Sequence, residues 1–532
     1  MYLLLIGTLL LPLVSSCPLG CSCIEKRFLA ICDAADFGSV PVGLPSDITE
    51  LSLSKNRIKL LSDNSIPANL GLIKLDLSEN QIFDISTLAF GARNSALQQA
   101  LTTLTLHSNQ ITLVPTEALQ NLRFLQDLSL GGNSIKWMRA ESFTGLTRLN
   151  NLDLSSNGLD QLAADAFKGL DNLQSLNLSE NSLKILSPGM LRHLTSLSTL
   201  DLSRNSIRMI SPGSLSHFTR LDELFLTANR ISALDPGIFT TISHNLKLLD
   251  LTRNEVTSLK HGVFRGCNQL ITLKLGHNMM SYISEENEYP FQGLYKLRVL
   301  RLDSNRLISL PATSKAWNDL KNLQELYLSG NLLQILPEFE PITMLPGLQK
   351  LDISANLLST LKAGSFRCFP NLENLDVSNN VISEVGTGTF GRNKILKVVN
   401  MVRNRLKTPN ITWFTRPSTA EVPATSYVFH LATNPWTCDC RAVAFAASVL
   451  DLKENVKINM NEMTCHEPSP LRGRNFTWLA TEAKMDCKEK YNFTFLTILL
   501  FVVIVFFCGA ALLRYYACKT KEGFQKPISK YL

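Results

Sequence analysis

The sequence predicts an α/β-type solenoid, a curved stack of similar coils whose short parallel strands line its concave face. Three observations predict this fold. Leucines and an asparagine recur together about every 24 residues. A cysteine cluster stands at each end of the recurring region. The 532-residue chain is also 45% apolar and only 18% charged, which excludes disorder as its main state.

Residues 1–16 have the pattern of a secretory signal peptide. Residues 2–14 are apolar, and the small residues that follow fit cleavage after Ser16. We therefore expect secretion into an oxidising compartment, where cysteines can form disulfides.

Residues 48–428 contain about 15 copies of the pattern Leu-x-x-Leu-x-Leu-x-x-Asn. Alternation along a strand sends the leucines to one side and places the residues between them on the other, concave side. No coil can bury its own leucines, so stability must come from stacking between neighbours. The asparagines that end the strands are Asn56, Asn80, Asn109, Asn133, Asn157, Asn181, Asn205, Asn229, Asn254, Asn278, Asn305, Asn331, Asn356, Asn380 and Asn404.

Cysteines flank the repeats on both sides. The open ends of a solenoid expose leucines and strand edges, so we expect each cluster to cap one end. Residues 17–47 hold Cys17, Cys21, Cys23 and Cys32, and residues 429–488 hold Cys438, Cys440, Cys465 and Cys487. Spacing alone leaves three connectivities open in each cluster. Cys267 and Cys368 lie about four coils apart, too far for a disulfide, and are expected to be buried thiols.

A second apolar run, residues 493–513, predicts a transmembrane helix. Its 21 residues include no charged side chain and would span about 31 Å as a helix, the thickness of a bilayer core. The tail that follows, residues 514–532, is basic and is therefore expected to be cytoplasmic. The sequence thus predicts a single-pass type I protein of the plasma membrane with its repeats outside. Whether Cys518 is lipidated stays open.

The net charge of +7 is concentrated in that tail, which has five basic residues and one acidic residue. The rest of the chain then has a net charge of about +3, too small to indicate nucleic-acid binding. Nineteen residues are also too few to form a folded signalling domain.

These features resemble the extracellular leucine-rich repeat transmembrane receptors. The repeats and both cysteine clusters carry the resemblance, including the run from Asn434 to Cys440. The resemblance implies a horseshoe that binds protein or glycan with its curved surface, without a cofactor. It also implies the disulfides Cys17–Cys23, Cys21–Cys32, Cys438–Cys465 and Cys440–Cys487. Toll-like receptors belong to this family, but the expected tail lacks their TIR domain. The layout is therefore most similar to short-tailed members that act as co-receptors, ligand presenters or adhesion molecules.

The sequence offers no catalytic constellation. Its eight histidines are scattered, and the aspartates between the strand leucines are typical repeat residues. We therefore expect no enzyme activity, no metal site and no cofactor.

Departures from the repeat pattern on the concave face predict a binding patch. Between the two strand leucines, the first seven repeats carry only Ser, Asp, Thr or Asn, whereas repeats 8 to 12 carry Phe225, Asp250, Lys274, Arg301 and Tyr327. Aromatic and arginine side chains are favoured at the energetic centres of interfaces. Random drift on an unselected surface is the alternative explanation. The predicted ligand contacts are Phe225, Lys274, His277, Arg298, Arg301 and Tyr327.

Three asparagines, Asn177, Asn410 and Asn475, are predicted glycosylation sites because each begins an Asn-x-Ser/Thr sequon. Asn177 lies between strand leucines and is expected on the concave face. A glycan there would block ligands from repeats 5 to 7, which agrees with a contact further along the array.

Together these observations predict a cell-surface receptor or adhesion protein that binds an extracellular protein ligand and acts with a membrane co-receptor. Two alternatives stay open. The chain could be a cis-acting auxiliary subunit or chaperone of another membrane protein, or an innate immune recognition or decoy receptor without a signalling domain of its own. Ligand identity and homo-oligomerisation are not predicted, because side chains on a common scaffold do not name a partner.

Overall fold

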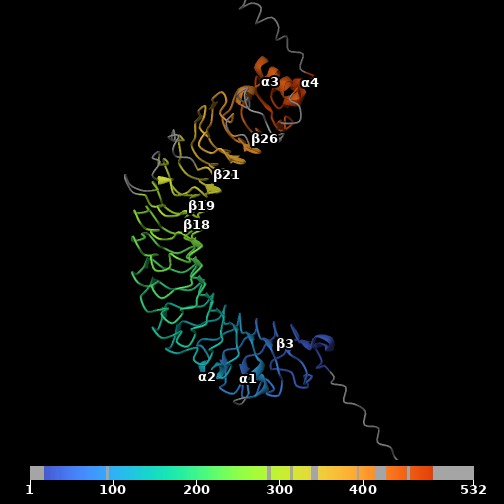
Figure 1. Ribbon diagram of the computed structural model, residues 1–532. Coiled ribbons are helices and arrows are strands. Elements are labelled where there is room, and N and C mark those ends of the chain that lie inside the picture. Colours follow the sequence, from blue (N-terminus) through green and yellow to red (C-terminus); the bar gives the residue numbers. More distant parts are fainter. Residues whose placement is uncertain are drawn as a thin grey trace, which may run out of the picture.

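Short strands from successive coils form one long sheet along the inside of a curved arc in the computed structural model of the chain (Figure 1). The structure describes residues 17–91, 95–283, 289–311, 316–336, 345–391, 393, 395–413, 427–451 and 456–482. The N-terminal coils lie at one end of the open arc and the C-terminal helices at the other. The predicted horseshoe solenoid with a parallel concave sheet is therefore confirmed.

The concave sheet has nineteen strands within the described residues. Only the first pair, β1 with β2, is antiparallel, and every later pair is parallel and in register with the next coil. The strands are β1 (Ser22–Ile24), β2 (Leu29–Ile31), β3 (Glu50–Ser52), β5 (Lys74–Asp76), β7 (Thr103–Thr105), β8 (Asp127–Ser129), β10 (Asn151–Asp153), β12 (Ser175–Asn177), β14 (Thr199–Asp201), β16 (Glu223–Phe225), β17 (Leu248–Asp250), β18 (Thr272–Lys274), β19 (Val299–Arg301), β20 (Glu325–Tyr327), β21 (Lys350–Asp352), β23 (Asn374–Asp376), β25 (Val398–Asn400), β26 (Tyr427–His430) and β28 (Val456–Ile458).

Shorter elements complete the coils. Two-stranded pairs are formed by β4 (Leu60–Leu61) with β6 (Asp84–Ile85), β9 (Trp137–Met138) with β11 (Gln161–Leu162), β13 (Ile185–Leu186) with β15 (Met209–Ile210), β22 (Thr360–Leu361) with β24 (Glu384–Val385), and β27 (Trp436–Thr437) with β29 (Cys465–Glu467). The α-helices are α1 (Ala96–Ala100), α2 (Thr116–Leu119), α3 (Cys440–Asp451) and α4 (Phe476–Thr481), and the 3-10 helices are η1 (Glu25–Arg27), η3 (Ile411–Trp413) and η4 (Ser469–Leu471).

The asparagine that ends each strand binds its own coil to the coil before it. Asn205 is 8% exposed, and its Nδ2 donates to the carbonyl oxygens of Leu202 at 3.0 Å and of Leu178, one coil earlier, at 2.9 Å. Its Oδ1 accepts from the backbone N–H of Leu183 at 3.0 Å. These bonds satisfy buried backbone groups that no strand partner reaches. The repeated asparagine is therefore a backbone partner and not a ligand of the concave face.

Phenylalanines fill the convex side of the core. Phe143 and Phe167 stack with ring centroids 6.0 Å apart, and Phe239 and Phe264 stack at the same distance. All four rings are at most 1% exposed. Because leucines from the sheet side meet this row of rings, the core is continuous from coil to coil.

Disulfides lie near both ends of the described solenoid. Cys17 pairs with Cys23, Cys21 with Cys32, and Cys438 with Cys465, the pairings that the family resemblance implies. Cys440 is also disulfide-bonded, while its expected partner Cys487 lies outside the described residues. At the C-terminal end, the fully buried Trp436 meets the ring of Phe476 from α4 at 6.0 Å. An aromatic cluster therefore covers the last coil.

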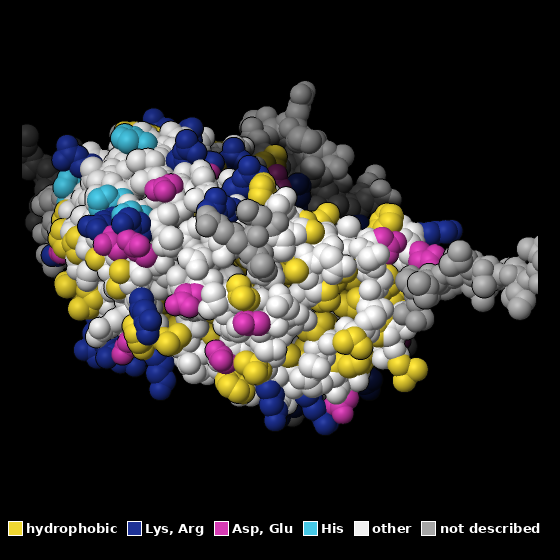
Figure 2. All heavy atoms as spheres, turned by 90° about the horizontal axis from the view of Figure 1, so that it is seen from below, with side chains coloured by type: hydrophobic (Ala, Val, Ile, Leu, Met, Phe, Trp, Pro, Cys, Tyr) yellow, Lys and Arg dark blue, Asp and Glu magenta, His cyan; other side chains and the backbone are white. Residues whose placement is uncertain are grey.

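The outer surface of the N-terminal coils has a mixed character. Positive and negative side chains are interspersed on the face seen in Figure 2, with apolar side chains in small groups between them. This distribution agrees with the small net charge outside the tail.

Some of the sequence predictions lie outside the described residues. They are the signal peptide at 1–16, the apolar run at 493–513, the basic tail at 514–532 and Cys518. Among the residues that the structure does describe, no helix has the length and apolarity needed to cross a bilayer.

Candidate functional site

Most of the polar side chains between the strand leucines are committed to the scaffold. Asp153 Oδ1 accepts from the backbone N–H of Ser155 at 3.0 Å, and Asp201 Oδ1 accepts in the same way from Ser203 at 2.8 Å. Such a bond, from a side chain to the backbone two residues on, closes the turn that ends the strand. The row of aspartates is therefore explained by turn formation. Within the described part of the chain, no group of three His, Cys, Asp or Glu side chains is arranged to hold a metal.

This row is interrupted on strands β16 to β20. Parallel pairing places Phe225, Asp250, Lys274, Arg301 and Tyr327 side by side in one line across the sheet. Asp250 still accepts the turn-closing hydrogen bond, from the backbone N–H of Thr252 at 2.9 Å. The side chains of Phe225, Lys274 and Arg301 have no acceptor for such a bond, and the Tyr327 hydroxyl instead donates to Glu325. These four coils therefore lack a local stabilising contact and present aromatic and cationic groups instead.

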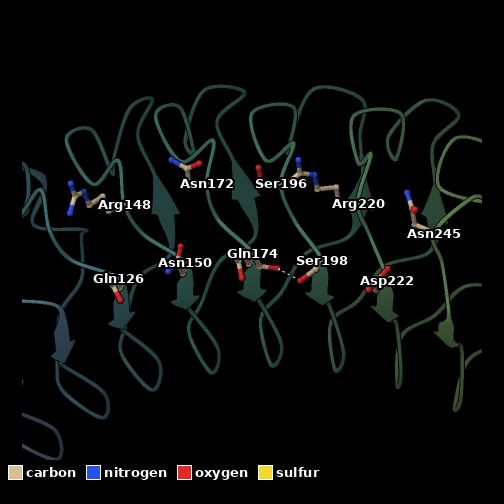
Figure 3. Close-up of a pocket in the computed structure, with 10 residues that line it drawn as sticks. All are labelled: Gln126, Arg148, Asn150, Asn172, Gln174, Ser196, Ser198, Arg220, Asp222 and Asn245. Carbon is tan, nitrogen blue, oxygen red and sulfur yellow. Dashed lines mark hydrogen bonds between the residues drawn. The ribbon is translucent and has the colours of Figure 1, made fainter.

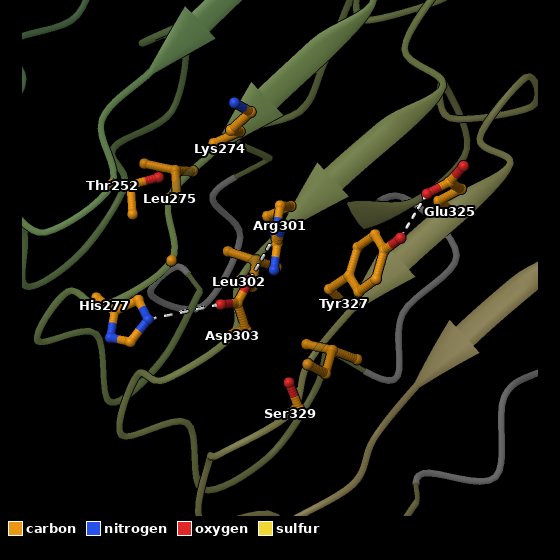
Figure 4. Close-up of polar contacts among 12 residues, drawn as sticks. Thr252, Lys274, Leu275, His277, Arg301, Leu302, Asp303, Glu325, Tyr327 and Ser329 are labelled. Atoms are coloured by element: carbon orange, nitrogen blue, oxygen red, sulfur yellow. Dashed lines mark hydrogen bonds and ion pairs between the residues drawn. The ribbon is translucent and has the colours of Figure 1, made fainter. Parts of the chain in front are cut away.

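The cationic groups of the line are held by carboxylates. Lys274 Nζ lies 3.0 Å from Asp250 Oδ2, and Arg301 Nε donates to Asp303 Oδ1 at 2.9 Å (Figure 4). His277 Nε2 lies 4.0 Å from the other carboxylate oxygen of Asp303. Asp303 is 8% exposed, and its hydrogen bond holds the Arg301 side chain, while His277 lies close to the same carboxylate.

Gly276 makes room for Asp303. A Cβ atom at Gly276 would lie 3.0 Å from each of the two carboxylate oxygens. Most other coils carry Ser or Thr at this position, as with Ser203 and Thr252. A side chain at position 276 would therefore force the carboxylate away from its two partners.

Tyr327 lies between two cations. The guanidinium of Arg301 is 4.7 Å from the centre of its ring, and Lys350 Nζ is 4.9 Å from that centre. Its hydroxyl donates to Glu325 Oε2 at 2.6 Å. Burial and this hydrogen bond raise the pKa of Tyr327, which keeps the phenol neutral at physiological pH. The ring is thus held by two cation–π contacts and one hydrogen bond.

Two apolar side chains form an interrupted apolar strip beside this line, with Thr272 of β18 between them. Leu248 and Val299 occupy the outward-facing position two residues earlier on β17 and β19, and both are half-buried. The equivalent residues of earlier coils are polar, for example Asn151 and Ser175. The sequence prediction considered the residue between the two leucines and cationic or polar neighbours such as His277 and Arg298, and it missed these two apolar residues. The signal that could have identified them is the same departure from the polar pattern, two residues earlier.

The predicted contacts are not equally close together. Lys274, His277, Arg301 and Tyr327 form one cluster through Asp250, Asp303 and Glu325. Phe225 stands at the edge, separated from Lys274 by the Asp250 strand. Arg298 precedes β19 and is exposed on the flank of the sheet. The cluster with its apolar strip, formed by Phe225, Leu248, Lys274, His277, Val299, Arg301 and Tyr327, is called the concave patch below.

Asp250 gives the concave patch a defined pH response. Burial acts to raise the pKa of this carboxyl, but hydrogen bonds from Thr252 and Lys274 outweigh burial and hold the pKa below its ordinary value of 3.8. A carboxyl whose pKa is lowered by folding stabilises the protein above 3.8, and this stabilisation is lost as the pH falls toward the lower, folded-state pKa. We therefore expect Asp250→Asn to lower stability by about 1–3 kcal/mol at pH 7.

At pH 3 the wild type and Asp250→Asn should be closer in stability, because protonation begins to remove the same charge from the wild type. Thermal unfolding followed by circular dichroism at both pH values checks this. A difference between the two proteins that stays constant from pH 7 to pH 3 would contradict the role given to the Asp250 charge.

A second feature is a polar groove on the flank of the array, with a volume of about 660 Å³. One row of its lining comes from the starts of strands β8 to β16, and the second row comes from the preceding turns (Figure 3). The strand row is Gln126, Asn150, Gln174, Ser198 and Asp222, and the turn row is Arg148, Asn172, Ser196, Arg220 and Asn245. No motif in the sequence pointed to this groove, because its two rows are brought together by the turn of each coil. It is called the flank groove below.

The predicted glycosylation sites have different settings. Asn177 lies on β12 in the concave sheet and is half-buried, and its Oδ1 accepts from the N–H of Ser179 at 3.0 Å. Asn410 is exposed beside η3. Asn475 caps α4, where its Oδ1 accepts from the N–H of Trp478 at 2.8 Å.

Cys267 and Cys368 are buried, and burial raises the pKa of the Cys267 thiol to about 12.

A disulfide-capped stack of coils with a variable concave surface defines the class of repeat-scaffold binding proteins. The family model described as leucine rich repeat matches residues 99–159, 147–207, 192–231, 219–280, 244–307 and 340–382, and a second leucine rich repeat model matches residues 322–341. The chain belongs to the leucine-rich repeat family.

Curated relatives match shorter stretches. The transforming growth factor beta activator LRRC33 of Danio rerio is 34% identical over 122 residues, which are 23% of this chain and 17% of that protein. Decorin of Equus caballus is 32% identical over 23% of this chain and 31% of its own length. Toll-like receptor 9 of Mus musculus is 29% identical over 44% of this chain and 22% of its own length. The match thus spans less than a third of each relative.

Solved structures share the fold. The Drosophila Toll–Spatzle complex aligns with a TM-score of 0.64 and 20% identity, covering 81% of this chain and 63% of the matched chain. A leucine-rich repeat protein of Leptospira interrogans aligns with a TM-score of 0.60 and 28% identity, covering 78% of this chain and 96% of its own. The likeness to Toll shows the solenoid fold alone.

Proposed function

We propose that this protein is a cell-surface binding protein that contacts an extracellular protein ligand through the concave patch. The observation that carries the proposal is the interruption of the turn-closing row on β16, β18, β19 and β20. There, aromatic and cationic side chains replace Asp and Asn, and two apolar residues, Leu248 and Val299, lie beside the line. Aromatic and arginine side chains held by fixed partners beside apolar residues are features of an interface hot spot.

The charged and aromatic side chains of the concave patch are already held in place, which favours binding. Asp250, Asp303 and Glu325 fix Lys274, Arg301 and Tyr327 before a ligand arrives. A ligand then restricts few side-chain rotations, so less binding energy is lost to ordering. The relatives support a protein ligand: one is named an activator of a growth factor, and Toll was solved in complex with Spatzle.

The layout proposed for the chain completes this function. A signal peptide at 1–16, a membrane span at 493–513 and a short tail would place the patch outside the cell and leave signalling to a membrane co-receptor. The chain would then act as a ligand-binding subunit or an adhesion molecule.

The test uses a soluble ectodomain, residues 17–490, added to cells that express the full-length protein and to cells that lack it. Saturable binding to both cell types is the result expected for a separate surface ligand, and binding to the expressing cells alone indicates adhesion between copies of the chain. Binding to neither cell type, together with no capture of a soluble ligand, would contradict the proposal.

A cis-acting auxiliary subunit is the second candidate, and a cleft of mixed polar and apolar lining away from the concave patch, with an exposed tryptophan at its border, favours it. Trp137 is 47% exposed and borders a cleft of about 330 Å³ with Leu113, Pro115 and Met138. In that case Trp137→Ser would weaken association with the partner subunit, while changes in the concave patch would leave it unchanged. Co-precipitation of Trp137→Ser and of a concave-patch variant with the membrane partner separates the two functions.

A further inference from the structure

We propose that the flank groove is a carbohydrate site and that its occupant is the chain's own N-linked glycan at Asn177. The inference goes beyond ligand binding by the concave patch, and it rests on the secretory location proposed above. It concerns a different surface, from repeat 4 to repeat 9, and a covalent group of this chain.

The groove offers sugar-compatible chemistry along its whole length. Gln126, Asn150 and Gln174 present amide groups at the coil spacing of about 4.8 Å. An amide both donates and accepts hydrogen bonds, as the hydroxyls of a sugar do. The other lining side chains are amides, hydroxyls, two arginines and Asp222. The lining includes none of the aromatic or aliphatic side chains that form the centre of protein interfaces, so it does not favour a protein partner.

The charges in the groove favour a neutral or weakly acidic glycan. Arg148 and Arg220 stand about 15 Å apart, three coils from one another. The single carboxylate, Asp222, lies 2.8 Å from Lys247 Nζ and is therefore already paired. The guanidinium of Arg148 lies 4.6 Å from the ring of Phe124, which holds it at the end of the groove.

The backbone makes the groove rigid. The carbonyl oxygens of Asn150 and Gln174 each accept a hydrogen bond from the next coil at 2.8 Å. Ser198 Oγ also donates to the carbonyl of Gln174 at 2.9 Å. Because these backbone groups are satisfied, the side-chain amides are available to a ligand at fixed spacing.

Asn177 begins the sequon whose glycan could reach the flank groove. It belongs to β12, the strand that begins directly after Gln174, in the middle coil of the groove. Asn177 follows Gln174 by three positions, about 10 Å along the strand. The hydrogen bond from Ser179 to Oδ1 holds the amide against its own backbone. Nδ2, to which a glycan would be attached, therefore lies on the opposite side of the amide group. The first sugars can then cross the edge of the sheet into the groove.

The experiment compares the full-length protein, expressed in mammalian cells, with a variant that cannot carry this glycan. Ser179→Ala removes the sequon but keeps the Asn177 side chain and the backbone N–H that binds it. Ser203→Ala is the matched control, because Ser203 occupies the same position one coil later behind Asp201, which is not a sequon. Glycopeptide mass spectrometry measures occupancy at Asn177, Asn410 and Asn475. Phenylglyoxal labelling measures the accessibility of each arginine.

We expect Arg148 and Arg220 to be labelled severalfold faster in Ser179→Ala than in the wild type or Ser203→Ala. Labelling of Arg265, exposed on the convex side, should be the same in all three proteins. A second variant, Asn150→Ala with Gln174→Ala, should keep the glycan at Asn177 but lose the protection of the two arginines. An unchanged thermal midpoint shows that this variant folds.

Two results would overturn the inference. One is an unoccupied Asn177 in protein that carries glycans at Asn410 and Asn475. The other is an occupied Asn177 with equal arginine labelling in all variants. Absence of glycan at all three sites would overturn the proposed secretory location as well. That result therefore differs from a failure of the carbohydrate-site proposal alone, in which Asn410 and Asn475 still carry glycans.

Discussion

Replacing Asn205 by alanine is expected to lower the free energy of unfolding by about 2–5 kcal/mol. The change removes the donor to the carbonyls of Leu178 and Leu202 and the acceptor for the N–H of Leu183. These backbone groups belong to two coils and are buried, and each buried group left without a partner costs about 1–3 kcal/mol. The measurement is urea unfolding followed by circular dichroism, with the midpoint concentration as the readout.

Asn172→Ala is the matched control for this prediction. Asn172 is exposed, and its Nδ2 donates a single hydrogen bond, to the carbonyl of Thr147 at 2.9 Å. Its loss should change stability by no more than about 0.5 kcal/mol. Equal midpoints for the two variants would show that the buried ladder does not hold neighbouring coils together.

The double variant Arg301→Glu with Tyr327→Ala is expected to weaken ligand binding by about 30-fold or more. The first change reverses a charge beside Asp303, and the second removes the ring that packs under Arg301 and Lys350. Loss of a central aromatic and arginine pair typically costs about 2 kcal/mol or more at an interface. Surface plasmon resonance with the purified ligand, or saturation binding to ligand-bearing cells, measures the change.

A concave charge reversal in another coil provides the comparison. Lys74→Glu on β5 also breaks an ion pair on the sheet, since Lys74 Nζ lies 3.2 Å from Glu50. It should leave affinity within about twofold, because rim charges contribute little to affinity. If the double variant binds as tightly as Lys74→Glu while both remain folded, the concave patch is not the ligand contact.

The fold was predictable because its signal is local and repeated. A strand leucine and its asparagine occupy the same places in every coil, so an irregular repeat can still be recognised from the regular repeats beside it. Asn205, for example, lies after its strand at the place that the repeat predicts. The same reasoning placed Lys274, Arg301 and Tyr327 on one surface, because parallel pairing in register leaves no other arrangement.

The partners of those side chains were not predictable from the same pattern. Asp303 lies two residues beyond Arg301, at a position that carries Ser or Thr in most coils, and its carboxylate fits only because Gly276 in the preceding coil lacks a Cβ. This contact depends on two coils at once. The flank groove likewise needs the geometry of the turns that bring Arg148 close to Asn150. Signals of this kind appear only when the spacing between coils is known.

The two end caps also determine where the stack can open. A solenoid with free ends frays one coil at a time, because each terminal coil has a single neighbour. Here the first described coil is tied by Cys17–Cys23 and Cys21–Cys32, and the last is held by Cys438–Cys465 and covered by Trp436. Opening at the two ends is then disfavoured, and opening in the interior separates two leucine-lined interfaces at the same moment. We expect a protein built in this way to exchange slowly with unfolded forms, and its lifetime in the presence of proteases to be set by the rate of that opening.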